Sequence, residues 1–213
     1  EAFAVNSTQY LAVTMNKEHL PVKIYKMEGT ATPQLVAYYD LPGAAHTKST
    51  KHFKLGGFHY LALANERLGS DQSTYSLLYR LEPHTGKFVL YQQLPSQGSQ
   101  GFEYYEIGDH AFLAVCNKWK SYNSDTSVNS IIYQWNAKTA RFEEQQTIMT
   151  LAAVAFEHFV VDDLHYLAVA NSGAGDSNNK NDQGLMDGQY DVDSVIYRWN
   201  PSTSRMEEHH KIR

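Results

Sequence analysis

Apolar and aromatic residues occur along the chain in short runs that partly alternate with polar residues, and the same runs return at a nearly constant spacing. The run Tyr-Leu-Ala-Val at 10–13 returns, extended and slightly changed, at 60–65, 112–117 and 166–171. Alternation with a period of two over such short stretches is typical of β-strands and is too short for helices. Each run therefore predicts one strand, and the repetition predicts four equivalent units.

Every unit contains three further predicted strands. An aromatic residue stands seven positions before each of these runs, and a tyrosine-containing run follows it; the tyrosines are Tyr25, Tyr79, Tyr133 and Tyr197. A fourth apolar run begins nine or ten residues after each tyrosine. Since a single four-stranded sheet cannot bury both of its faces, such units are expected to stack as the blades of a β-propeller.

The predicted fold is therefore all-β, a β-propeller of four repeats of about 50 residues with four antiparallel strands each. We expect one domain over residues 1–213, with repeats at approximately 1–42, 43–95, 96–150 and 151–213. Two arrangements remain open: a closed four-blade ring, or part of a larger propeller. Because unpaired terminal blades would expose apolar faces, a closed ring or a homodimer is favoured over an isolated open arc.

One connection in each unit varies in length while the rest stays constant. The spacing from the aromatic of the second strand to the tyrosine of the third is 15, 19, 21 and 31 residues, whereas the spacing from that tyrosine to the next unit is 28, 26 and 26. Insertions of this kind lie on one face of a repeat protein, often its binding face. Function is therefore expected on residues 14–23, 66–76, 118–130 and 172–194.

The repeat resembles the EAR repeat, also called EPTP or epilepsy-associated repeat, which occurs in leucine-rich glioma-inactivated proteins. Three linked blocks of the fourth unit carry the resemblance best: Phe156-Glu157-His158-Phe159, the run 166–171 and the segment 194–200, which reads Ser-Val-Ile-Tyr-Arg-Trp-Asn. The match spans the whole chain. It implies a secreted β-propeller that binds other molecules and has no catalytic activity of its own.

Two features of the resemblance bear on chemistry. The family carries an acidic residue facing the central channel, but the matching positions here are Ser49, Gly101 and Ala155, so a channel metal is not implied. The assignable channel positions are accordingly expected to be small or uncharged. We expect Glu103 and Glu157 to contribute to stability rather than to turnover.

The histidines also follow the repeat. His52 and His158 occupy one repeat position, and His59 and His165 occupy another. Positions that recur with the scaffold are better explained by packing and hydrogen bonding between strands than by a metal-ligand set. Cys116 replaces an alanine of the repeat, so we expect it to be a small buried hydrophobic residue.

Composition excludes several classes of protein. The chain has 18 Lys and Arg against 23 Asp and Glu, a formal net charge of −5, so it has no basic surface for nucleic acid. No apolar run approaches the roughly 20 residues that a membrane span requires, and membrane insertion is not expected. The nucleophile, metalloprotease and nucleotide-binding motifs G-x-S-x-G, H-E-x-x-H, G-x-x-x-x-G-K-[ST] and G-x-G-x-x-G are missing from the sequence, so an enzyme is not expected.

The third variable segment contains the main candidate for ligand binding. Trp119 lies outside the repeating Tyr-x-Trp-Asn position of Trp135 and Trp199, so the scaffold does not require it. An indole beside ammonium and amide groups can stack on a sugar ring or anchor a protein interface, or it can fold down to cap its own blade. The candidate binding residues are Lys118, Trp119, Lys120, Tyr122 and Asn123.

The fourth variable segment is rich in carboxylates, amides and glycines. Calcium takes six to eight oxygen ligands from such a set, although the segment at 176–181 does not match an EF-hand. A solvated loop is the simpler interpretation. If a calcium ion binds, Asp187, Asp191 and Asp193 are the expected ligands.

Asn6 begins an Asn-Ser-Thr acceptor pattern for N-glycosylation, which is consistent with a secreted protein. The sequence thus favours a secreted, non-enzymatic recognition module that binds an extracellular protein or cell-surface partner through its variable loops. A multivalent glycan-binding lectin is the alternative. Protein binding is favoured over glycan binding because repeated lectin sites should share polar residues and these loops share almost none. A hydrophobic small-molecule binder and an enzyme are less well supported.

Overall fold

The fold is built only from short strands and their connections. The computed structural model describes residues 1–213 except 16, 18–19, 30–31, 69–72, 120–126 and 174–191. In the described part of the chain, every regular element is a strand. The strands are β1 (Ala2–Val5), β2 (Thr8–Val13), β3 (Val22–Glu28), β4 (Gln34–Leu41), β5 (Thr47–Leu55), β6 (Phe58–Asn65), β7 (Ser73–Glu82), β8 (Lys87–Gln97), β9 (Ser99–Ile107), β10 (His110–Asn117), β11 (Ser127–Asn136), β12 (Arg141–Leu151), β13 (Ala153–Val161), β14 (Leu164–Asn171), β15 (Ser194–Asn200) and β16 (Arg205–Ile212).

Consecutive strands form four separate four-stranded sheets in the orders β1–β4, β5–β8, β9–β12 and β13–β16. All neighbours within a sheet are antiparallel, as short hairpin connections require. In every sheet the register shifts at the same point of the third strand, just before its tyrosine, as it does between Ile24 and Tyr25. A bulge at this point increases the local twist, so each sheet has the twisted shape of a propeller blade. The predicted fold class is confirmed.

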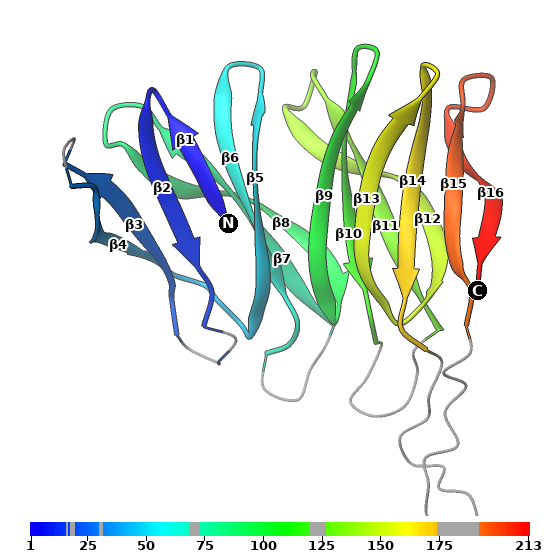
Figure 1. The fold of residues 1–213 in the computed structure, drawn as a ribbon, viewed down its shortest axis with the longest axis horizontal. Helices are drawn as coiled ribbons and strands as arrows, with labels where there is room; N and C mark the ends of the chain where they lie inside the picture. Colours follow the sequence, from blue (N-terminus) through cyan, green and yellow to red (C-terminus); the bar gives the residue numbers. More distant parts are fainter. Residues whose placement is uncertain (16, 18–19, 30–31, 69–72, 120–126, 174–191) are drawn as a thin grey trace, which may run out of the picture.

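The four sheets stand side by side in an open row (Figure 1). The first sheet, β1–β4, lies at one end of the long axis and the last, β13–β16, lies at the other. Among the described residues these two end sheets do not meet, so the chain does not form the closed four-blade ring that was one of the two expected arrangements. Among the last three sheets the first strands lie close together, since β5 and β13 both contact β9, and Phe3 of β1 stacks on His52 of β5. We call β1, β5, β9 and β13 the inner strands.

The hydrophobic core consists of three layers, one at each boundary between neighbouring sheets. The layer between the second and third sheets joins Leu78 and Leu94 to Leu113 and Val115. Equivalent layers lie between the first and second sheets and between the third and fourth. Each sheet thus buries a face only by contacting its neighbours, which is the reason that the repeat works as a stack.

Three residues singled out in the sequence belong to these layers. Trp135 and Trp199 pack against the core as scaffold residues. Cys116 is 1% exposed and free, and burial raises the pKa of its thiol well above the usual range. The expectation of a buried, unreactive cysteine agrees with this position.

A search of the described residues for a helix long and apolar enough to cross a membrane finds none.

Candidate functional site

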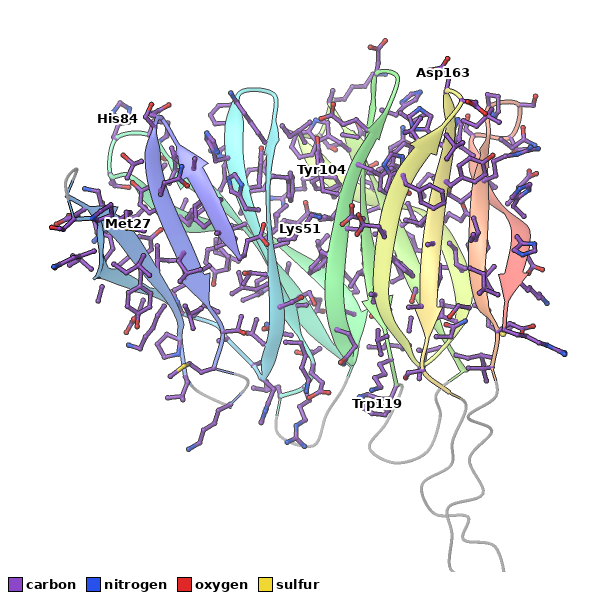
Figure 2. All side chains as sticks on the ribbon, viewed as in Figure 1. Met27, Lys51, His84, Tyr104, Trp119 and Asp163 are labelled. Atoms are coloured by element: carbon purple, nitrogen blue, oxygen red, sulfur yellow. The ribbon has the colours of Figure 1, made fainter. Side chains whose placement is uncertain are left out.

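The variable connections join the second and third strands of each sheet, so they all emerge at one end of the row. Figure 1 shows this end at the bottom, and Figure 2 places Trp119 there, whereas His84 and Asp163 lie at the opposite end. We call it the loop end. The hairpin turns between first and second strands lie at the other end, since adjacent turns of an antiparallel sheet alternate.

An asparagine anchors the base of each of the last three variable connections, and it is buried in the first two of them. Asn117 is fully buried at the end of β10, where its Oδ1 accepts a hydrogen bond from the Gln97 amide (2.9 Å) and its Nδ2 donates to the Asn129 carbonyl (2.8 Å). The backbone N–H of Asn117 donates to Ser130 Oγ at 3.0 Å. One side chain therefore ties the start of the connection to its end and to the link from the preceding sheet.

The same arrangement recurs at the equivalent positions. Asn65 accepts hydrogen bonds from Ala45 N and Thr47 Oγ1 and donates to the carbonyls of Gly43 and Tyr75. Asn171 accepts from Leu151 N and donates to the Asp193 carbonyl. Asparagine suits this role because its amide can donate and accept at once.

Trp119 packs onto the turn that links the second sheet to the third. Gly98 has a φ of +59°, and a Cβ built there would lie 2.4 Å from Trp119 Cδ1, so the indole occupies the space that glycine leaves open. The Lys118 ammonium lies 4.3 Å from the centre of the indole ring, within the range of a cation–π interaction. Among the described atoms, the buried Trp119 Nε1 has no hydrogen-bond partner. Trp119 therefore covers part of the turn at Gly98, and the Lys118 ammonium lies over the indole ring.

Charged side chains from neighbouring strands complete this site. The Lys48 ammonium lies 3.1 Å from Glu66 Oε2, and Gln100 Nε2 donates to Glu66 Oε1 at 3.3 Å. Glu66 is only 8% exposed. Burial lowers the pKa of Lys118, an effect that the nearby Glu66 carboxylate opposes and the Lys48 ammonium adds to. We call Lys48, Glu66, Gln100, Lys118 and Trp119 the loop-end cluster.

An apolar groove of about 750 Å³ opens beside this cluster, between the first and second sheets. Its walls include large hydrophobic side chains that are well exposed: Leu68 at 54%, Tyr75 at 53% and Leu90 at 51%. The loop end thus combines an exposed apolar surface with a charged rim, a combination that is typical of interaction sites.

The structure brings together part of the predicted binding segment. Lys118 and Trp119 lie in contact, whereas Lys120, Tyr122 and Asn123 fall outside the described residues. Sequence reasoning missed Lys48, Glu66 and Gln100, although one signal was available. Glu66 follows Asn65 as Lys118 follows Asn117, so aligning the repeats places both charges at the same corner of adjacent blades.

The calcium prediction is only partly covered by the structure. Asp187 and Asp191 lie outside the described residues. Asp193 forms an ion pair through its Oδ1 with Arg213 Nε at 3.4 Å. Over the described ranges, no group of three or more His, Cys, Asp or Glu side chains is arranged to hold a metal ion.

Asn6 lies in the exposed turn between β1 and β2, with a positive φ of 46°. This turn is at the end opposite the loop end, so a glycan there would leave the loop-end cluster uncovered. Modification of Asn6 remains a prediction.

Charged side chains also line the inner strands, which corrects the expectation of small or uncharged channel positions. Lys51 on β5 and Glu103 on β9 form an ion pair of 2.5 Å, and Glu103 is 7% exposed. Burial raises the pKa of Glu103, while the Lys51 contact and a hydrogen bond from the His158 backbone oppose the rise. The expected positions Ser49 and Gly101 lie on the same face, two residues earlier, because side chains alternate along a strand.

A double-mutant cycle on Lys51 and Glu103 tests this ion pair. Glu103→Ala leaves a partly buried ammonium without its partner, so we expect it to lower the free energy of unfolding by about 2 kcal/mol. Lys51→Ala leaves the buried carboxylate unpaired and should cost a similar amount. The double variant should cost clearly less than the sum in urea denaturation, and strict additivity would show that the two charges do not interact.

The repeated histidines form two hydrogen-bonded pairs. His52 Nε2 lies 3.0 Å from His59 Nδ1, and the equivalent His158 and His165 lie at the same distance. Burial, followed by the paired histidine, lowers the pKa of both His52 and His158 to about 4. Their ring nitrogens thus bond each other across two strands, as the packing interpretation expects.

Four stacked, four-stranded antiparallel blades define this protein as a repeat protein of the β-propeller class. Solved structures of the same fold include an exo-β-1,3-galactanase from Phanerochaete chrysosporium (TM-score 0.52, 11% identity, 98% of this chain and 61% of that chain). A GH32 β-fructofuranosidase from Bombyx mori is similar (TM-score 0.51, 11% identity, 98% and 49%). At such low identity these similarities establish the fold and nothing about activity.

The chain belongs to the EPTP domain family, which matches residues 87–136 and 141–200. It is 38% identical over 128 residues to the human thrombospondin-type laminin G domain and EAR repeat-containing protein, covering 59% of this chain and 17% of that protein. The mouse protein of the same name is 36% identical over 178 residues, covering 83% and 25%. The chain thus spans a quarter or less of these relatives. Family membership confirms the resemblance and supports an interaction module in general.

Proposed function

We propose that the chain is a secreted, non-enzymatic recognition module that binds an extracellular protein partner at the loop end of its first three blades. The observation that carries this proposal is the apolar groove of Leu68, Tyr75 and Leu90 beside the charged loop-end cluster. An apolar centre with a polar rim is how protein interfaces are built, and aromatic residues such as Tyr75 dominate their energetics.

The loop-end cluster also favours one partner surface over a repeated small ligand. At the boundary between the third and fourth sheets, Val154 and Ser172 stand at the positions equivalent to Gln100 and Lys118. Ser172 donates its hydroxyl to the Ala152 carbonyl rather than joining a charge cluster. The charge cluster is therefore not repeated at the described residues of this boundary, whereas a lectin that works by avidity requires the same shallow site in several blades.

Glycan binding is kept as a second candidate because a half-buried tryptophan lies beside ammonium and amide groups. The indole already contacts the Lys118 ammonium and the backbone at Gly98, so less of its surface is available for a sugar ring. An enzyme would need a pair of catalytic groups in a cleft, and Glu103 is instead engaged by Lys51 in the interior.

Binding of the fluorescently labelled protein to cultured cells tests the proposal. We expect Tyr75→Ala and Lys118→Glu each to weaken binding about tenfold or more, since central interface residues typically contribute over 1 kcal/mol. Phe58→Ala and Lys138→Glu are matched controls at the opposite end and should leave binding unchanged.

Treatment of the cells separates the two candidates. Loss of binding after mild trypsin treatment supports a protein partner, whereas binding that survives trypsin but is removed by glycosidases supports the glycan alternative. If the control variants lose as much binding as Tyr75→Ala and Lys118→Glu, or if these two variants bind as well as the unmodified chain, the binding site does not lie at the loop end.

A further inference from the structure

The apolar groove between the first and second sheets has a counterpart at the next boundary. A pocket of about 390 Å³ opens between the second and third sheets. Pro95 and Asn117 line it at the positions that Pro42 and Asn65 occupy in the apolar groove. We call the apolar groove the first hollow and this pocket the second hollow. The repeat thus places a hollow at both boundaries and furnishes each with different side chains.

Both hollows lie on the outer side of the row, at the loop end. Their lining residues come from the second to fourth strands and the connections, and none belongs to an inner strand. A tyrosine hydroxyl of the third strand marks each boundary: Tyr79 donates to the Pro42 carbonyl, and Tyr133 donates to the Pro95 carbonyl at 2.8 Å. Because both boundaries are internal, blades added beyond the first or the fourth sheet would leave the two hollows as they are.

The start of β7 forms a common wall between the two hollows. Thr74 and Tyr75 line both of them. Side chains alternate along a strand, so Tyr75 projects on the same side as Leu77 of the first hollow, whereas Thr74 projects on the opposite side. Since Tyr75 is 53% exposed, a ligand that lies over this wall reaches both hollows.

The first hollow suits a bulky apolar side chain. The buried side chains of Leu77 and Tyr79 contribute to its lining, and the exposed side chains of Leu68, Tyr75 and Leu90 surround them. An aliphatic or aromatic side chain placed here would remove these apolar surfaces from water, which is the main source of affinity in protein interfaces.

The second hollow instead offers amide and hydroxyl groups that are free to bind a ligand. Its polar side chains include those of Thr74, Gln97, Asn129 and Thr147. Within the described residues, none of these four side chains makes a hydrogen bond, and Asn129 and Thr147 are exposed. Amides and hydroxyls both donate and accept, so they match a side chain of the same kind.

Charge further restricts what can occupy the hollows. No described residue that lines either hollow is charged, although charged residues make up 19% of the chain. An ionised side chain that entered either hollow would lose water without meeting an opposite charge, which is costly. The electrostatic complement of both hollows is therefore an uncharged segment, whereas the charged loop-end cluster contacts other parts of the partner.

We infer that one short extended segment of the protein partner lies across both hollows. Its bulky aliphatic or aromatic side chain occupies the first hollow, and an Asn, Gln, Ser or Thr side chain occupies the second. In an extended chain every second side chain points the same way, so two of them can enter the hollows while the backbone crosses the wall at Tyr75. This inference rests on the proposed function and specifies the partner that the loop end recognises.

The cell-binding assay tests the two hollows separately. Leu90→Asp places a charge in the first hollow and Thr147→Glu places one in the second, each at an exposed residue. We expect each variant to weaken binding about tenfold or more, as Tyr75→Ala does. Val89→Asp changes the neighbouring exposed residue of β8, which lines neither hollow, and Ala137→Glu adds a charge in the exposed β11–β12 turn. Both controls should bind like the unmodified chain.

The pattern of losses separates this inference from the proposed function. If Tyr75→Ala and Leu90→Asp weaken binding and Thr147→Glu does not, the partner uses the first hollow alone; the proposed function then stands and this inference falls. If none of the three weakens binding, both fall. Losses in all three that persist on trypsin-treated cells would also overturn the inference, because the segment would then not be a peptide.

A phage-displayed library of short random peptides, panned on the unmodified chain, tests the chemistry of the segment. Enriched peptides should share a bulky apolar residue and an amide or hydroxyl residue at a fixed spacing, with no charge at either position. In fluorescence anisotropy, replacing the apolar residue of such a peptide by alanine should weaken binding to the unmodified chain about tenfold or more and have little further effect on Leu90→Asp.

Two results of the library experiment would overturn the inference. One is a charged residue at either shared position of the enriched peptides. The other is enrichment no greater than on the double variant Leu90→Asp and Thr147→Glu. Circular dichroism verifies that every variant is folded, and Leu90→Ser replaces Leu90→Asp if that variant is not.

Discussion

Asn117→Ala should lower the free energy of unfolding by about 1 to 3 kcal/mol. The substitution removes the acceptor of the Gln97 amide and the donor to the Asn129 carbonyl, and the Asn117 side chain that makes both bonds is fully buried. A buried polar group left without a partner costs roughly 1 to 3 kcal/mol, and the pocket of about 390 Å³ beside Gln97 and Asn129 keeps the expected loss within that range rather than at twice it. Chemical denaturation followed by tryptophan fluorescence measures the change.

Asn136→Ala is the matched control for this prediction. Asn136 also binds backbone amides, those of Lys138 and Thr139, but it does so in an exposed turn where water replaces it. We expect a change below about 1 kcal/mol there. Equal effects of the two substitutions would show that the asparagine at the base of the loop is not a structural anchor.

Acidification should destabilise the protein between about pH 6.5 and pH 4. The pKa of His52 and of His158 is lowered from 6.5 to about 4 in the folded chain, so the unfolded chain binds more protons in this window. Stability is therefore fully present above pH 6.5 and is lost as the pH falls toward 4. One pKa unit corresponds to about 1.4 kcal/mol, and partial exposure of both rings reduces the expected loss to about 1 to 2 kcal/mol for each histidine.

The third sheet suggests the variant that removes this dependence. Tyr104 occupies the position of His52 and His158 and stacks on Phe53 in the same way. The double variant His52→Tyr and His158→Tyr should keep the stacking while flattening the pH profile of the melting temperature. His84→Gln, in an exposed turn, should leave the profile unchanged.

Glu103 contributes with the opposite sign to the same pH profile. Its pKa is raised, so protonation of its carboxyl favours the folded state as the pH falls. The comparison between the unmodified chain and the double histidine variant cancels this effect. An identical acid dependence in both proteins would contradict the assignment to His52 and His158.

The strands and their grouping into blades were predictable because they depend on local patterns. Period-two alternation locates a strand, and the tyrosine that recurs from Tyr25 to Tyr197 fixes its place in the blade. Short turns then force neighbouring strands to pair in order. The same logic identified Trp135 and Trp199 as scaffold residues.

The open row and the charged inner strands were not predictable in this way. Whether blades close depends on the rotation between sheets, which is set by many packing contacts and not by any run of residues. The loop-end cluster combines Lys48 with Lys118 across 70 positions of sequence, and only the stacking of two blades brings them together. The channel expectation was wrong because it considered Ser49 and Gly101 and not the next residues on the same face, Lys51 and Glu103.

The asparagines at the base of the variable connections allow these connections to differ in length and chemistry. Asn65, Asn117 and Asn171 fix both ends of their connections to the blade, so the distance that a connection must span stays the same whatever its length. Closing a longer loop between fixed ends adds only about 0.6 kcal/mol for each doubling of length. In each of these blades one loop can therefore be exchanged for another of different length and chemistry while the sheet keeps its structure.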